Sequence, residues 1–351
     1  MSRPSIALPS RLLSKLLAPL GALALAAALL QAPPASAQGF EPEAPPAASL
    51  PAPLIELPAA EPFQTLDLDW FDASRQRAVP VRLYLPQGAS TEKPAPLVVF
   101  SHGIGGSRRG YSYLGQFWAG QGYASLHLQH VGSDRTLWQG NVFGVVGRLQ
   151  AAAQESEAVA RVQDLKFALD QLLAGEHARS LDARRIVAAG HSYGANTTLL
   201  AVGARVEREG RAIELRDARL KGAIVISAPP FYGEKSAPAI LGAIEVPTLH
   251  VTATEDIIRV PGYYSPASDR LVVFDATGGP RKTLAVFSGG SHSIFTDRGG
   301  TGGAVLNPQV KRATQLLSLA FLRQVFDEDA AGLAGWPQRF GDLVSRFSTS
   351  P

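Results

Sequence analysis

Apolar residues are distributed along this chain in two main patterns. Uninterrupted apolar runs, typical of strands covered on both faces, lie at 96–100, 123–128, 186–189, 222–227, 247–253 and 283–287. Apolar residues with helical spacing lie at 111–121, 151–173, 195–202 and 310–326. Two partly alternating segments, 65–71 and 79–85, flank a polar stretch, which predicts a hairpin at the edge of a sheet.

The alternation of strands with helices predicts the fold class. Helical crossovers between consecutive strands favour parallel pairing, so we expect an α/β fold with a mostly parallel central sheet and helices on both faces. Residues 131–147 lack clean periodicity, and we expect a long loop there, over the site derived below. The last 20 residues are expected to fold back as a short, weakly held segment.

The N-terminal segment differs from the rest in composition. Residues 1–37 carry basic but no acidic side chains, then an apolar run from about 16 to 30, and end in Ala35-Ser36-Ala37. This order is typical of a secretory signal. We expect cleavage near Ala37, a Pro/Ala-rich linker over 38–62 and one domain over 63–351, in a bacterial protein of the periplasm or the medium. An uncleaved membrane anchor is the alternative, and after cleavage we expect no stable membrane span.

Charge and cysteine content exclude several function classes. The chain has 33 basic and 30 acidic residues, and the predicted signal contains Arg3, Arg11 and Lys15, so the remainder is balanced at 30 of each sign. Without a basic cluster in that remainder, we expect no nucleic-acid partner. The chain has no cysteine, which excludes disulfides, a thiol nucleophile and a cysteine-based metal site.

The motif Gly190-His191-Ser192-Tyr193-Gly194 stands between an apolar run and a segment that suits a helix. A serine hydroxyl is a weak nucleophile, so it must stand on a sharp, exposed turn where a base can reach it and a carbonyl can approach. Gly190 and Gly194 keep side chains out of that crowded turn. We therefore predict Ser192 as a nucleophile between a strand and a helix.

A nucleophilic serine needs a general base, and the chain has seven histidines. His292 follows the last apolar run in a Gly-Gly-Ser-His-Ser loop, and the chain order serine, acid, histidine favours it. The pattern gives the other histidines different interpretations: core packing for His250, orientation away from Ser192 for His191, and a solvated helix end for His177. The spacing of His127 and His130 would allow a metal ligand pair, but no acidic pattern supports it, and we expect no metal.

The third group should be an acid between Ser192 and His292, at the end of a strand, where it can hold the imidazole and stabilise its charged form. Asp256 follows the apolar run 247–253 and is our prediction. Glu255 lies one residue out of phase. Asp269 and Asp275 follow a Pro-Gly-Tyr-Tyr-Ser-Pro turn and are expected at the surface or at helix caps.

Acyl transfer also needs two backbone N–H groups that face the developing oxyanion. One should come from Tyr193, the residue after the nucleophile, and the other from the loop His102-Gly103-Ile104-Gly105-Gly106, with Ile104 as the expected donor. A phosphate-binding loop is excluded because no Lys-Ser/Thr pair follows the glycines. No cofactor is expected.

These segments resemble a known group of proteins. Residues 100–108 (Phe-Ser-His-Gly-Ile-Gly-Gly-Ser-Arg), the Gly190–Gly194 motif, the Asp256 turn and Gly290-Ser291-His292 are similar to the α/β-hydrolase superfamily. Within it, the chain over about 65–327 resembles the branch of platelet-activating-factor acetylhydrolases and bacterial dienelactone-hydrolase-like proteins. The resemblance implies an α/β-hydrolase fold and a cofactor-free Ser-Asp-His esterase. The motif and the last histidine loop also resemble bacterial polyester hydrolases and cutinases.

The function predicted from these observations is an exported serine hydrolase that cleaves carboxylic esters through an acyl-enzyme. The substrate would be a small-molecule or lipid-like ester, and nothing in the pattern specifies an oligomeric state. Acyltransferase, lipase, polyester hydrolase and amidase activities use the same groups and stay open, as does an inactive envelope-binding protein. Aromatic residues that could line an acyl or alcohol pocket are Trp118, Trp138, Phe231, Tyr232, Tyr263 and Tyr264.

Overall fold

A nine-stranded sheet forms the centre of the domain. The computed structural model describes residues 54–350 except 209, 232–235, 261–262 and 299–301. The predicted signal peptide and most of the predicted linker lie outside the described residues. The strand order is β1 (Phe63–Asp72), β2 (Arg77–Pro86), β4 (Ala124–Leu128), β3 (Ala95–Ser101), β5 (Leu181–His191), β8 (Leu220–Ile226), β9 (Thr248–Glu255), β12 (Lys282–Ser291) and β13 (Val344–Thr349).

The inner strands of the sheet run parallel. Parallel pairs join β4, β3, β5, β8, β9 and β12, whereas β1–β2, β2–β4 and β12–β13 pair antiparallel. The β1–β2 hairpin lies at one edge, as predicted. Parallel strands place all their carboxyl ends at one edge of the sheet, so residues that follow β3, β5, β9 and β12 meet there.

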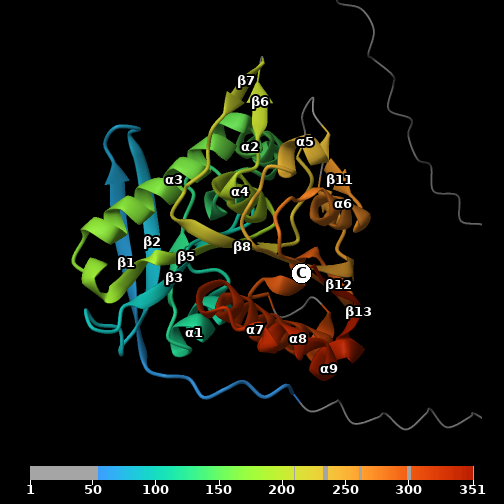
Figure 1. Cartoon of the computed structure of the whole chain (residues 1–351). Coiled ribbons are helices and arrows are strands. Elements are labelled where there is room, and N and C mark those ends of the chain that lie inside the picture. Colours follow the sequence, from blue (N-terminus) through green and yellow to red (C-terminus); the bar gives the residue numbers. More distant parts are fainter. Residues whose placement is uncertain (1–53, 209, 232–235, 261–262, 299–301, 351) are drawn as a thin grey trace, which may run out of the picture. The chain divides into compact units, whose positions relative to one another are not determined.

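Helices cover both faces of this sheet (Figure 1). On one face lie α3 (Glu155–Ala174) and α4 (Tyr193–Val202), with α5 (Ala237–Leu241) and α6 (Ser268–Ala276) further along. On the other lie α1 (Ser112–Gly120), α7 (Gly303–Asp327), α8 (Ala331–Ala334) and α9 (Trp336–Phe340). This arrangement confirms the predicted α/β class.

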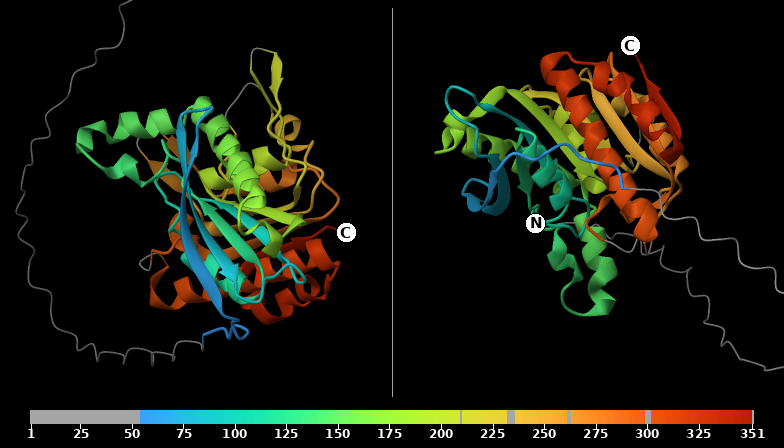
Figure 2. Two further views of the ribbon diagram at one scale, coloured as in Figure 1. Left: turned by 90° about the vertical axis from the view of Figure 1, so that its left-hand side faces the viewer. Right: turned by 90° about the horizontal axis from the view of Figure 1, so that it is seen from below.

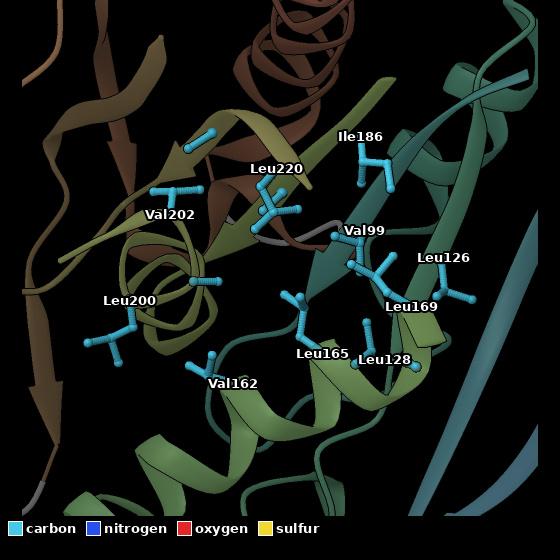
Figure 3. Packing of buried hydrophobic residues seen from close by; sticks show 14 of the residues in the cluster. Val99, Leu126, Leu128, Val162, Leu165, Leu169, Ile186, Leu200, Val202 and Leu220 are labelled. Carbon is cyan, nitrogen blue, oxygen red and sulfur yellow. The ribbon is translucent and has the colours of Figure 1, made fainter. Parts of the chain in front are cut away.

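Each face of the sheet has its own apolar core. Under α3 and α4, the side chains of Val162 and Leu165 pack against Val99, Leu126 and the neighbouring strand residues (Figure 3). The opposite core is built around larger side chains, including Trp118, Phe287 and Phe321. The two cores hold the sheet from both sides and so fix the positions of its strand ends.

The segment after β4 is more ordered than predicted. In place of one long loop over 131–147, the chain forms the 3₁₀ turns η1 (Arg135–Trp138) and η2 (Val142–Gly144), followed by α2 (Val145–Ala152). The predicted helix 151–173 is in fact divided between α2 and α3. Short turns of this kind give no clean apolar period, which explains the error. In both views of Figure 2 the green segment that contains α2 projects from the sheet.

The prediction of a weakly held C-terminal segment was wrong. Residues of β13 extend the central sheet at its far edge by pairing with β12. Just before them, Trp336 is buried, and its ring stacks on that of Phe347 at 5.2 Å. β13 is an edge strand that pairs only with β12 and is partly exposed, so its apolar pattern is weak. Its extended conformation depends on the pairing with β12, which no local pattern predicts.

Smaller elements were also not predicted. They are the hairpins β6 (Val206–Arg208) with β7 (Arg211–Ile213) and β10 (Ile258–Val260) with β11 (Tyr263–Ser265), and the 3₁₀ turns η3 (Ala178–Ser180), η4 (His292–Phe295) and η5 (Gly341–Leu343). Helix α7 (Gly303–Asp327) begins before the predicted residue 310. Its first turns were not predicted because they contain Gly303 and Pro308, which are poor helix formers. None of the helices in the described part of the chain has the length and apolar character that a bilayer crossing requires.

The described end of the predicted linker, 54–62, contains neither helix nor strand. It is nevertheless attached to the domain, because the Ile55 amide donates to Gln309 Oε1 and the Ile55 carbonyl accepts from the Arg312 guanidinium. Ile55 also packs against the core under α7. The domain boundary therefore lies nearer to the N-terminus than residue 63.

Candidate active site

Ser192 occupies a sharp turn between β5 and α4. Its backbone has φ 56° and ψ −123°, a conformation that residues other than glycine rarely adopt. The Ser192 amide donates to the Ile226 carbonyl at 2.9 Å, which ties the turn to the neighbouring strand β8. The turn is tight on both sides: a Cβ at Gly190 would overlap the Gly194 carbonyl, and one at Gly194 would overlap the Ser101 carbonyl. Glycine is therefore required at both positions.

Three of the predicted side chains form a hydrogen-bonded row. Ser192 Oγ lies 2.8 Å from His292 Nε2, and His292 Nδ1 lies 2.6 Å from Asp256 Oδ1. The histidine is carried by the turn η4 directly after β12, and the aspartate follows β9. Because β5, β9 and β12 are parallel, residues 192, 256 and 292 reach the same edge of the sheet although they are far apart along the chain.

Asp256 is fully buried and held in its ionised form. Burial alone would raise its pKa, but the hydrogen bond and charge of His292, together with the nearby Arg270 guanidinium, lower the pKa well below its usual range. Its second oxygen, Oδ2, accepts from the Thr252 hydroxyl at 2.7 Å. Arg270 Nε lies 3.5 Å from Oδ1, while its Nη1 donates to Ser265 Oγ and to the Ala228 carbonyl. Both carboxylate oxygens therefore have fixed partners.

His191 orients the backbone of His292. Its Nε2 lies 2.9 Å from the His292 carbonyl and can only donate there, so Nδ1 accepts from the Tyr111 hydroxyl at 2.8 Å. Burial, followed by the nearby charge of His292, lowers the pKa of His191 to about 3, so its imidazole is neutral at neutral pH. Tyr111 Oη also accepts from the Gly103 amide at 3.4 Å. This chain of contacts connects the His292 turn with the loop after β3.

The amides of Ile104, on the loop after β3, and of Tyr193, the first residue of α4 after β5, lie at the same edge of the sheet. Within the described ranges, no backbone or side-chain acceptor takes either of these two N–H groups. The Gly103 carbonyl, which shares a peptide group with the Ile104 amide, accepts from His102 Nδ1 at 2.7 Å and from the Gly106 amide at 3.0 Å. Since the C=O and N–H of a trans peptide point in opposite directions, these bonds fix the direction of the Ile104 N–H.

The other acids and histidines considered as candidates lie at the surface or have structural contacts. Glu255 is exposed, whereas Asp269 accepts from the Ser265 hydroxyl in the first turn of α6, and Asp275 is exposed at its end. His250 is buried in β9 against the Phe274 ring. The partly buried His177 lies beside Glu176.

His127 and His130 do not form a pair. His127 contacts the Gly110 carbonyl and the Ser125 hydroxyl, while His130 lies between Asp164 and Ser101. Among the described residues, no group of three or more histidines and acids is arranged as a metal site.

The predicted aromatic lining is only partly placed near Ser192. Trp118 is a core residue whose indole N–H donates to Ser318, so its prediction as a lining residue was wrong. Trp138 is half exposed and donates to the Gly105 carbonyl at 3.0 Å, which puts it beside the Ile104 loop. Phe231 packs on the core under α4 and α5, and Tyr263 and Tyr264 belong to β11. Tyr232 lies outside the described residues.

The sequence pattern also missed a buried polar cluster behind the site. Arg161 and Asp164 are both fully buried on α3, together with His130 and Ser133 at the end of β4. The signal was present: Ala158, Arg161, Val162 and Leu165 share one helical face, so a charged residue stood on the apolar side of the predicted helix. A charge at such a position is rare unless it has a partner or a function.

The comparisons with known proteins agree with this architecture. Residues 77–137, from β2 to the turn η1, match the family model described as platelet-activating factor acetylhydrolase, isoform II. That family is a group of α/β-hydrolase serine esterases. The matched segment includes the Ile104 loop, whereas Ser192, Asp256 and His292 lie outside it. No curated protein shows a match to the chain. With the mostly parallel nine-stranded sheet, the match shows an α/β-hydrolase fold and suggests an ester hydrolase.

Proposed function

We propose that this protein is a serine esterase that cleaves carboxylic esters through an acyl-enzyme on Ser192. The observation that carries the proposal is the continuous row Ser192 Oγ–His292 Nε2 and His292 Nδ1–Asp256 Oδ1, at 2.8 Å and 2.6 Å, on a strained turn. The first distance is within the range that proton transfer from the serine to the imidazole requires, and the second lets the carboxylate orient the imidazole. The family match of the Ile104 loop supports the same chemistry.

In this mechanism His292 Nε2 takes the proton of Ser192 Oγ while the oxygen forms a bond to the ester carbonyl carbon. The carbonyl electron pair moves to oxygen, and the amides of Ile104 and Tyr193 donate to this oxyanion. Collapse of the tetrahedral intermediate breaks the bond to the alcohol oxygen, which leaves with the proton from His292. Water then attacks the acyl-enzyme by the same route, and the acid is released. The Asp256 carboxylate stabilises the charged imidazole in both halves of the reaction.

The direct test is hydrolysis of p-nitrophenyl acetate and butyrate by the purified protein. Ser192→Ala should reduce kcat by at least about 10³-fold, because the nucleophile is lost. Ser345→Ala, which removes a serine hydroxyl on β13 far along the sheet, serves as the matched control and should leave kcat unchanged. A fluorophosphonate probe should label the wild type and not Ser192→Ala. Ser192→Ala with wild-type turnover would contradict the proposal.

Water as the acyl acceptor is part of this proposal. Adding methanol or hydroxylamine during turnover should divert only the fraction of acyl groups that their concentration and reactivity explain. Near-complete transfer to the added acceptor at low concentration would instead identify an acyltransferase.

We also propose export of the protein through its first 37 residues, whose basic start, apolar middle and Ala35-Ser36-Ala37 end are typical of a signal peptide. Expression of the full chain in a bacterial host should give a mature protein in the periplasm or medium. Its intact mass should correspond to a chain that begins at Gln38. An unprocessed chain in the membrane fraction would support the anchor alternative.

A further inference from the structure

Arg161 is the most deeply buried cation behind the proposed site. It extends from α3, and its side chain has no exposed surface. Its hydrogen bonds go to three neutral oxygens: Nε donates to Thr197 Oγ1 at 2.9 Å, Nη1 to Ser133 Oγ at 2.8 Å, and Nη2 to the His102 carbonyl at 2.5 Å. Burial lowers the pKa of the guanidinium to about 10, which leaves it charged at neutral pH.

Stability gives a poor reason for such a residue. Removing a guanidinium from water is costly, and an apolar side chain of similar volume often replaces a buried charge without loss. Among the described residues, Arg161 donates only to neutral oxygens, and the nearby Glu157 and Asp164 carboxylates act on its charge without a direct hydrogen bond. The contacts therefore suggest that the role of Arg161 is to position the groups that its guanidinium binds.

The groups that Arg161 holds belong to both halves of the proposed oxyanion hole. The His102 carbonyl precedes Gly103, whose own carbonyl shares a peptide group with the Ile104 amide. On the other side, the Arg161 guanidinium lies over the Tyr193 ring at 4.6 Å, and Thr197 Oγ1, which it contacts, donates to the Tyr193 carbonyl at 3.1 Å. One planar group thus contacts His102, in the loop that contains Ile104, and Tyr193, which supplies the second amide.

We propose that Arg161 is a positioning residue that sets the spacing of the two backbone donors, Ile104 and Tyr193, by joining the loop after β3 to the start of α4. This inference rests on the proposed esterase function. It concerns transition-state binding, because the two amides must converge on an oxygen that carries full negative charge only in the transition state and intermediate.

Two neighbouring threonines on α4 provide a matched test. Thr197 and Thr198 are both buried, and each hydroxyl donates to the carbonyl four residues before it, but only Thr197 contacts Arg161. Thr197→Val should reduce kcat for p-nitrophenyl butyrate about 10-fold with KM within threefold, whereas Thr198→Val should keep kcat within twofold; loss of a whole oxyanion donor costs about 10²–10³-fold. Arg161→Lys should reduce kcat about 10-fold and Arg161→Met about 100-fold, which is no more than the loss of one whole oxyanion donor.

A transition-state analogue separates positioning from general destabilisation. Butylboronic acid adds to the serine oxygen and places an oxygen of the tetrahedral adduct at the oxyanion position. Its Ki should rise across the variants in proportion to KM/kcat, which a merely structural role would not produce. Arg219→Met removes another hydrogen-bonded arginine, which contacts Lys166 and Asp170 in the C-terminal half of α3, and should lower the melting temperature without changing kcat.

The outcomes separate the two proposals. Equal kcat for Thr197→Val and Thr198→Val, or losses confined to KM, would overturn the role of Arg161 while leaving the esterase function intact. If Arg161→Met does not fold, the threonine pair and Arg161→Lys still decide the question. A wild-type protein without any hydrolysis or probe labelling would instead overturn the proposed function, and this inference with it.

Discussion

Acid should unfold this protein through its buried histidines. His127, His130, His191 and His250 are all buried, and burial, the largest cause in each case, lowers the pKa of each to about 3. Burial also lowers the pKa of His102 well below its usual range. In the unfolded chain a histidine has a pKa of about 6.5. Below pH 6.5 the unfolded chain therefore takes up protons that the folded protein does not, and the free energy of unfolding falls as the pH falls towards 3.

The size of the effect follows from these pKa values. At pH 5, each such histidine favours the unfolded state by about 1.5 pH units × 1.36 kcal/mol, or about 2 kcal/mol. The four histidines with a pKa of about 3 together contribute about 8 kcal/mol, which is comparable with the whole stability of a typical domain, about 5–15 kcal/mol. We therefore expect cooperative unfolding near pH 5 or slightly below, at pH values where most of the carboxylates are still ionised.

His250→Phe tests the reasoning with one residue. The side chain packs edge-on against Phe274 at 5.3 Å, and in the structure as described its Nε2 has no hydrogen-bond partner, so a phenyl ring can replace it. The free energy of unfolding in urea, measured by circular dichroism from pH 7.5 to pH 4.5, should improve relative to wild type by about 2 kcal/mol between pH 7 and pH 5.

Thr248→Val in the same strand is the control, because it removes a buried hydroxyl that does not titrate. Its stability curve should run parallel to that of the wild type at all pH values. A His250→Phe curve that is also parallel to the wild type would refute the argument, since it would mean that His250 takes up no extra proton on unfolding.

Two further predictions concern the site and the sheet edge. Asp256→Asn should reduce kcat about 10³–10⁴-fold with a small change in KM, because the neutral amide no longer stabilises the charged imidazole. Steady-state kinetics with p-nitrophenyl butyrate would measure this. A loss of kcat below about 10-fold would contradict the role of the carboxylate. Deletion of 344–351 removes β13 and its ring contact with Trp336. The free energy of unfolding should fall by about 3 kcal/mol, seen as a melting temperature lower by about 6–12 °C with kcat unchanged. An unaltered melting temperature would show that β13 contributes little to stability.

The sequence was most informative where one local rule determined the structure. The apolar runs that became β3, β5, β8, β9 and β12 are buried on both faces, so their pattern did not depend on a particular neighbour. The glycines around Ser192 were equally readable, because the turn leaves no room for a Cβ. In contrast, β13 and the η1–α2 segment depend on partners distant in sequence, and no local period predicts them.

The same distinction applies to the candidate site. Ser192, Asp256 and His292 could be predicted because each follows a strand, and parallel strands bring such positions to one edge. Arg161, Arg270 and His191 could not be assigned in this way. Each acts through a contact with a backbone carbonyl or with another side chain, and that contact exists only once α3, α6 and η4 have packed. The sequence shows only that Arg161 stands on an apolar face.

These supporting contacts explain how a strained turn can remain in place. The φ of 56° at Ser192 costs free energy of about 1–3 kcal/mol and is stable only if the surroundings determine it. The Ser192 amide is bound to the Ile226 carbonyl, the next turn is held through Arg161 and Thr197, and the opposing His292 backbone is held by His191. The strain is thus distributed over β5, β8 and α3, elements whose cores lie on both faces of the sheet. In the proposed mechanism, a rigid sheet edge of this kind would keep the serine hydroxyl and the two amides in place before substrate binds, which is the condition for electrostatic stabilisation of an oxyanion.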